Sequence, residues 1–234
     1  MALNVQVRDA DIERWIEHYL RRRRPELEGR FRAAWDAFRR ARRTGRLRDD
    51  DLALIAEAAR GSEAVLWQNA TSWLATLAMK HATAQAEVDA MSRDALARVR
   101  IAALGCLGRS SPRPLVTSVV LPALTDKSSR VRRMAADTAG RLGLREALPA
   151  MQRQRRVEKD AKARATLAFE IPLLRDGYIA KKTAGGIDLT VCGRGGVRGG
   201  HVSADEVRRQ GLDKIVAEWK RDLEENAITI EELP

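Results

Sequence analysis

The sequence predicts an all-α fold, a right-handed α-solenoid of about four helix pairs that closes with a small C-terminal β-hairpin and a helix. Ala and Leu are abundant and aromatic residues make up only 4% of the 234 residues, which suits closely packed helices better than a β-sandwich. Apolar residues recur at helical spacing through much of the chain. From about position 94, similar residues also recur at intervals of 32.

Residues 1–61 are expected to form an N-terminal helical cap. The apolar residues of its first helix share one face: Ile12, Trp15, Ile16, Tyr19 and Leu20. Pro25 ends this helix, because proline interrupts a helix interior. A second helix should end at Gly45, and a third should run from the acidic residues at 49–51 to Gly61.

The strongest signal is an internal repeat. Dipeptides that open a helix lie 32 residues apart: Val99-Arg100, Val131-Arg132 and Ala163-Arg164. The same offset relates two further sets: Asp94, Asp126 and Glu158; and Arg98, Arg130 and Lys162. A period of this length with two helical segments per unit is typical of a helical solenoid, because each pair buries its apolar face only against its neighbours.

The best repeat unit contains Leu121-Pro122-Ala123-Leu124-Thr125-Asp126, then Val131-Arg132, Ala135-Ala136 and Gly140-Arg141-Leu142-Gly143. With these features, residues 62–176 resemble the HEAT-repeat family, an armadillo-like helical fold. In that family the turn aspartate and the arginine form a ladder of contacts between neighbouring repeats. The resemblance therefore implies a structural role for Asp94, Arg100, Asp126, Arg132, Glu158 and Arg164.

Residues 177–234 are expected to form a β-hairpin followed by a helix. Apolar residues alternate between Ile187 and Val191, and a glycine-rich turn at 193–196 precedes a return strand from Val197 to Val202. Ser203 should cap the last helix. Because an isolated hairpin is marginally stable in water, it should pack on the solenoid end or on a partner.

No pattern of catalytic residues is present. His18, His81 and His201 are scattered, the two cysteines lie far apart, and the glycine-rich stretch lacks the dinucleotide-binding spacing. We therefore expect no catalytic residue, no metal and no small-molecule cofactor, and a protein that is not an enzyme. A DNA glycosylase built on HEAT-like repeats is an alternative. It is only a minor one, because the catalytic residues of that family cannot be matched to positions in this chain.

The net charge of +11 favours an acidic partner, although an arginine-rich composition from a GC-rich genome would give the same charge. Residues one repeat apart lie side by side in a solenoid. Arg98, Arg130 and Lys162 should therefore form one row of cations, and Arg109 and Arg141 a shorter one. Arg-Gly-Gly triplets at Arg194 and Arg198 add two arginines to the hairpin.

Two kinds of partner remain open for these cations. The leading prediction is a non-enzymatic module that binds the backbone of DNA or RNA, since neutralised phosphates release counterions. The alternative is a protein–protein adaptor, such as a regulatory or immunity scaffold that binds an acidic protein. Charged residues near the N-terminus and the absence of a long apolar stretch predict a cytoplasmic protein without a membrane partner.

Overall fold

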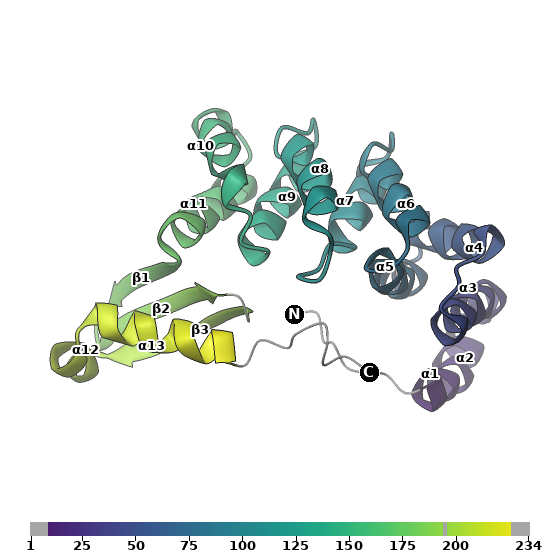
Figure 1. Ribbon diagram of the computed structural model, residues 1–234, viewed down its shortest axis with the longest axis horizontal. Helices are drawn as coiled ribbons and strands as arrows, with labels where there is room; N and C mark the ends of the chain where they lie inside the picture. Colours follow the sequence, from purple (N-terminus) through teal and green to yellow (C-terminus); the bar gives the residue numbers. More distant parts are fainter. Residues whose placement is uncertain (1–8, 194–195, 226–234) are drawn as a thin grey trace. The chain divides into compact units, whose positions relative to one another are not determined.

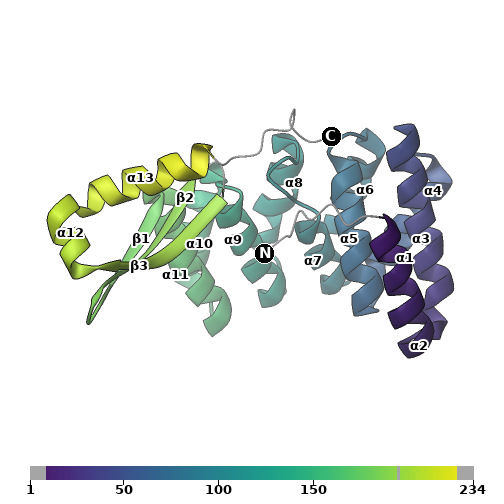
Figure 2. The ribbon, with the colours of Figure 1, turned by 90° about the horizontal axis from the view of Figure 1, so that it is seen from below.

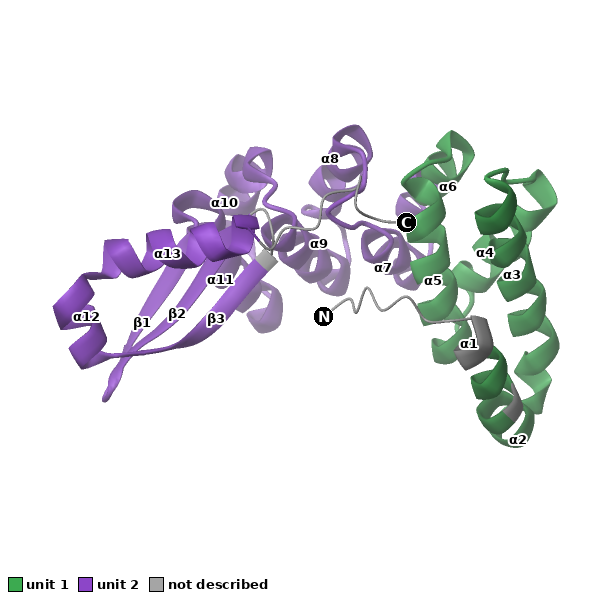
Figure 3. Cartoon of the chain, turned by 60° about the horizontal axis from the view of Figure 1, so that its bottom comes forward, with its two compact units in different colours: residues 1–88 green, residues 89–234 purple. Residues whose placement is uncertain are grey.

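The computed structural model describes residues 9–193 and 196–225, which form two compact units (Figure 3). Unit 1 covers residues 1–88 and unit 2 covers residues 89–234. The chain is mostly helical, as the sequence predicts. The division lies inside helix α6 (Ala82–Ser92), within the segment that the sequence assigns to the repeats.

Unit 1 consists of helices that match the predicted cap and the first predicted repeat helix. They are α1 (Asp9–Trp15), the π-helical turn η1 (Ile16–Leu20), α2 (Arg21–Arg23), α3 (Pro25–Thr44), α4 (Asp49–Arg60) and α5 (Ala64–Ala78). Pro25 occupies the first turn of α3, where its missing N–H costs nothing. Gly45 ends α3 in the left-handed conformation, with a φ of 65°.

The core of unit 1 is aromatic. Ring contacts at centroid distances of 5.2–5.8 Å join Trp15, Tyr19, Phe31, Trp35, Phe38 and Trp73. Five of these rings pack α3 against α1 and α5, whereas Tyr19 stacks on Trp15 and is 43% exposed.

Unit 2 begins with helices in two layers. These helices are α7 (Ala97–Gly105), α8 (Arg113–Ala123), α9 (Ser129–Arg141), the 3₁₀ turn η2 (Arg145–Ala147), α10 (Leu148–Val157) and α11 (Ala161–Asp176). In Figure 1, α8 and α10 lie in one layer and α7, α9 and α11 in the other. Small buried residues such as Ala102, Ala135 and Ala139 let these helices approach closely.

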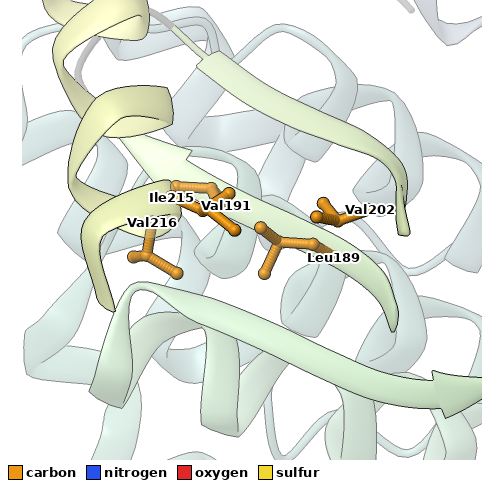
Figure 4. Close-up of a cluster of buried hydrophobic side chains, with 5 residues drawn as sticks. All are labelled: Leu189, Val191, Val202, Ile215 and Val216. Atoms are coloured by element: carbon orange, nitrogen blue, oxygen red, sulfur yellow. The ribbon is translucent and has the colours of Figure 1, made fainter. Parts of the chain in front are cut away.

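A three-stranded antiparallel sheet follows, in the order β1 (Tyr178–Thr183), β2 (Gly186–Gly193) and β3 (Gly196–Ser203). Helices α12 (Ala204–Gln210) and α13 (Leu212–Glu225) complete the unit, and α13 crosses one face of the sheet (Figure 2). A cluster of buried apolar side chains holds them together (Figure 4): Leu189, Val191, Val202, Ile215 and Val216.

The C-terminal region confirms the predicted hairpin and adds to it. Ile187 pairs with Val202 across β2 and β3, and the Ser203 side chain accepts a hydrogen bond from the Glu206 N–H, as a helix cap does. The sheet has one strand more than predicted, because β1 pairs along β2. The single predicted helix is divided at Gly211, whose φ of 79° does not fit a helix.

A candidate basic interface on the turn edge of the repeats

Two ion pairs join successive repeats and fix the turn between the two helices of each repeat. Arg100 on α7 donates from Nε and Nη2 to the two carboxylate oxygens of Asp126, at 2.6 and 2.8 Å. Arg132 on α9 binds Glu158 in the same way, with both distances at 2.6 Å. The spacing from arginine to acid is 26 residues in both cases, and the two pairs are 32 residues apart.

Each arginine also binds its own turn. The Nη1 group of Arg100 donates to the carbonyls of Asp94 and Ala95, at 2.7 and 2.9 Å. Arg132 repeats this contact with the carbonyls of Asp126 and Lys127, at 2.8 and 3.2 Å. One guanidinium therefore satisfies four acceptors in two neighbouring turns with four of its five N–H donors.

The turn acids close the turns as well. The side chains of Asp94, Asp126 and Glu158 each accept the N–H group two residues further along, at 2.8, 2.7 and 3.0 Å. In Glu158, whose side chain is fully buried, the hydrogen bonds from Arg132 lower the pKa to about 2. The negative charges of these turns are thus held inside the structure.

The ladder has two steps for a reason visible in the sequence. Arg164 is exposed, and the residue 26 positions further along is Thr190 rather than an acid. At the other end, the residue 26 positions before Asp94 is Gln68, which offers no guanidinium.

The row predicted from the sequence lies beside this ladder. Arg98, Arg130 and Lys162 are exposed and occupy the second position of α7, α9 and α11. The turns that the ladder joins also carry Lys127 and Lys159, which are exposed and again 32 residues apart. We call the surface formed by Arg98, Lys127, Arg130, Lys159 and Lys162 the basic edge. The period of 32 would have found both lysines.

The helix starts at the basic edge combine an exposed cation with a first turn that has no acidic residue. The first turns of α7, α9 and α11 contain no acidic residue, whereas those of α3, α4 and α12 do. The N-terminal end of a helix carries a partial positive charge, so a cation there is unfavourable and an anion is favourable. At α11 the N-cap residue Asp160 accepts the Ala163 N–H and offsets part of this charge. The N-caps of α7 and α9, Leu96 and Ser128, are uncharged, so the cations at these two helix starts favour an anionic ligand.

The shorter predicted row, by contrast, is turned toward the protein. Arg109 donates to the carbonyls of Gly193 and Arg141, at 2.9 and 3.1 Å, and so ties the end of β2 to the end of α9. Arg141 is half-buried and donates to the Leu107 carbonyl at 3.2 Å. Burial lowers the pKa of its guanidinium. Both arginines serve packing, and we leave them out of the basic edge.

Arg198, one of the two hairpin arginines of the predicted site, contacts α13. Arg198 stacks on the ring of Trp219, with its guanidinium carbon 4.3 Å from the ring centroid, and it forms an ion pair with Asp222. These contacts bind β3 to α13. Arg194 lies outside the described residues.

A buried acid lies where α9, α11 and the sheet meet. The carboxyl group of Glu170 is packed against Gly140, where a side chain would lie 1.6 Å from its oxygen, and only 7% of the residue is exposed. Its Oε2 atom has no hydrogen-bond partner. Burial, with a smaller effect from Asp137, raises the pKa of Glu170 to about 8, so the group is mostly protonated at neutral pH. The Cys192 thiol contacts the Gly140 carbonyl at 3.9 Å.

The comparison with known families agrees with this geometry. A family model for HEAT repeats matches residues 84–171, the segment that contains both ion pairs. Residues 84–171 are HEAT repeats. No curated protein matches the chain. The HEAT segment forms a helical repeat of the kind that binds partners, and the match does not identify the partner.

Other kinds of site are not seen in the described part of the chain. Across residues 9–193 and 196–225, no group of three or more His, Cys, Asp or Glu side chains is placed to hold a metal ion. Within the same ranges, every helix is too short or too polar to cross a bilayer.

Replacing Arg132 by Ala should lower the free energy of unfolding by about 3–5 kcal/mol, because it leaves the buried carboxylate of Glu158 without its cation. Arg113 is a matched control, since it binds Glu146 through two hydrogen bonds but both side chains are nearly half exposed. Arg113→Ala should cost about 0–1 kcal/mol. Urea denaturation measures both values, and equal losses would show that the ladder carries no special stability.

Replacing Glu170 by Gln should remove a pH dependence of stability. The pKa of Glu170 is about 8 in the folded protein and 4.5 without burial, so the folded state holds an extra proton between these values. The contribution of this proton to the free energy of unfolding is complete below about pH 4.5 and declines as the pH rises toward 8. Above pH 8 it stays constant, and the total loss is a few kcal/mol at most. Urea denaturation at pH 5, 6.5 and 8 should show a smaller decline for Glu170→Gln, and parallel pH profiles would contradict this assignment.

Proposed function

We propose that the protein is a non-enzymatic binding module whose basic edge binds the phosphate backbone of nucleic acid. The observation that carries this proposal is the recurrence of an exposed cation at the start of α7, α9 and α11, the second helices of three successive repeats, in first turns without acids. In the same turns, Asp126 and Glu158 are paired with Arg100 and Arg132.

The regular spacing favours a polyanion over other acidic partners. The ladder joins the second helix of one repeat to the turn of the next repeat. Because packed helices lie about 8–10 Å apart, cations at equivalent positions of neighbouring repeats are separated by a similar distance. Cations repeated at such an interval match a polymer with evenly spaced charges, because each contact with a phosphate releases a counterion. The charge pattern of an acidic protein surface has no such period, so a protein adaptor is the second candidate.

The test is a triple variant with Arg98→Glu, Arg130→Glu and Lys162→Glu. A matched control, Arg145→Glu with Arg209→Glu and Arg221→Glu, makes the same change in net charge at exposed positions of unit 2 away from the basic edge. Fluorescence anisotropy with labelled duplex and single-stranded DNA and with RNA, from about 50 to 200 mM salt, measures affinity and its salt dependence. Circular dichroism checks that both variants keep their helices.

We expect the edge variant to lose most of its affinity and to show a slope of log K against log salt that is shallower by about 2 to 3, since three phosphate contacts are lost. The control variant should keep most of the affinity of the wild type. Equal losses in the two variants would mean that overall charge, and not the basic edge, attracts nucleic acid. If the wild type binds no nucleic acid at low salt, the proposal is wrong, and the adaptor candidate is tested by isolating an acidic protein partner.

A further inference from the structure

One aromatic side chain on the HEAT helices is nearly half exposed. Unit 2 contains three aromatic residues, Phe169, Tyr178 and Trp219. Tyr178 and Trp219 pack against the apolar cluster under α13. Phe169, on α11, is 45% exposed, which leaves a large apolar ring in contact with water. A ring left exposed in this way is available to a ligand.

Phe169 shares a helix face with the basic edge. It follows Lys162 by seven residues, which is two turns of the helix and about 10 Å along its axis. Ala165, which lies between them on this side of the helix, is small and exposed, so nothing large separates the cation from the ring. A ligand that contacts Lys162 therefore reaches Phe169 by running along α11 away from its start.

The equivalent positions in the other repeats complete the surface. Asp137 on α9 and Gly105 on α7 precede Phe169 by 32 and 64 residues, and both are exposed. The carboxylate of Asp137 repels phosphate, so the phosphates must remain at the helix starts, where the cations are. At the level of Phe169 the surface offers a ring and an acceptor, which suit the face and the amino groups of a nucleobase.

We propose that the ligand of the basic edge is a single-stranded nucleic acid, with its phosphates on the cations and one unpaired base stacked on Phe169. This inference rests on the proposed function and adds the class of ligand. Bases in a duplex are stacked on one another and offer no free face, whereas an unpaired base stacks on an aromatic side chain. Phe169 then distinguishes single strands from duplexes, while the basic edge binds both.

The test compares Phe169→Ala and Phe169→Tyr with the wild type on three labelled ligands of equal length. They are a single-stranded oligonucleotide, a duplex, and an abasic single strand that keeps its phosphates but lacks its bases. Phe169→Ala should bind the single strand about 5- to 150-fold more weakly, the range for the loss of one stacked base. Its affinity for the duplex and the abasic strand should hardly change. The separate variant Phe169→Tyr keeps an aromatic ring and should bind the single strand as tightly as the wild type.

Val157→Ala is the matched control, because Val157 is a large apolar residue that is 67% exposed at the end of α10 and lies off the α11 face. It should leave all three affinities unchanged. An unaltered affinity of Phe169→Ala for the single strand, with salt-dependent binding intact, would overturn this inference and leave the proposed function standing. An equal loss on the duplex or the abasic strand would also overturn it. Absence of binding by the wild type to every ligand would instead overturn the proposed function.

Discussion

The buried contact of Arg132 with Glu158, and its counterpart between Arg100 and Asp126, is the constraint on which the HEAT segment and its basic edge both depend. A buried carboxylate is costly unless a cation and hydrogen-bond donors satisfy it, and here one guanidinium supplies both. The same contact orders two turns, because each arginine also donates to the carbonyls of its own turn. It thereby turns the acids inward and leaves exposed cations around them.

In unit 2, acidic residues of the turns are thus buried, whereas basic residues that neighbour them in the sequence are exposed. Glu158, in the turn before α11, is paired with Arg132, whereas Glu170 lies on the side of α11 that packs against Gly140 and meets the sheet. The pKa values of these two glutamates are shifted in opposite directions, because Arg132 stabilises the charged form of Glu158 while burial stabilises the neutral form of Glu170. Contacts of Arg109 and Cys192 complete the junction between the repeats and the sheet.

The sequence predicted the parts of the fold that local patterns determine. The helices, the Ser203 cap and the β2–β3 hairpin follow from helical and alternating spacing and from cap and turn residues, and the period of 32 located the HEAT repeats. The strand β1 was missed because Tyr178–Thr183 alternates weakly and is stabilised by pairing with β2. The orientations of the Arg141 and Arg198 side chains depend on contacts with residues that are distant in the sequence, the Leu107 carbonyl and the Trp219 ring. No local sequence pattern indicates that Glu170 is buried.

Ligand contacts should recur with the period of the repeat. The most direct test is amide chemical-shift mapping of the isotope-labelled protein during titration with a single-stranded oligonucleotide. Perturbed amides are expected in three groups, at the starts of α7, α9 and α11 and in the turns before them, 32 residues apart. Perturbations confined to other basic segments, such as the arginine-rich residues 39–48 of unit 1, would contradict this expectation.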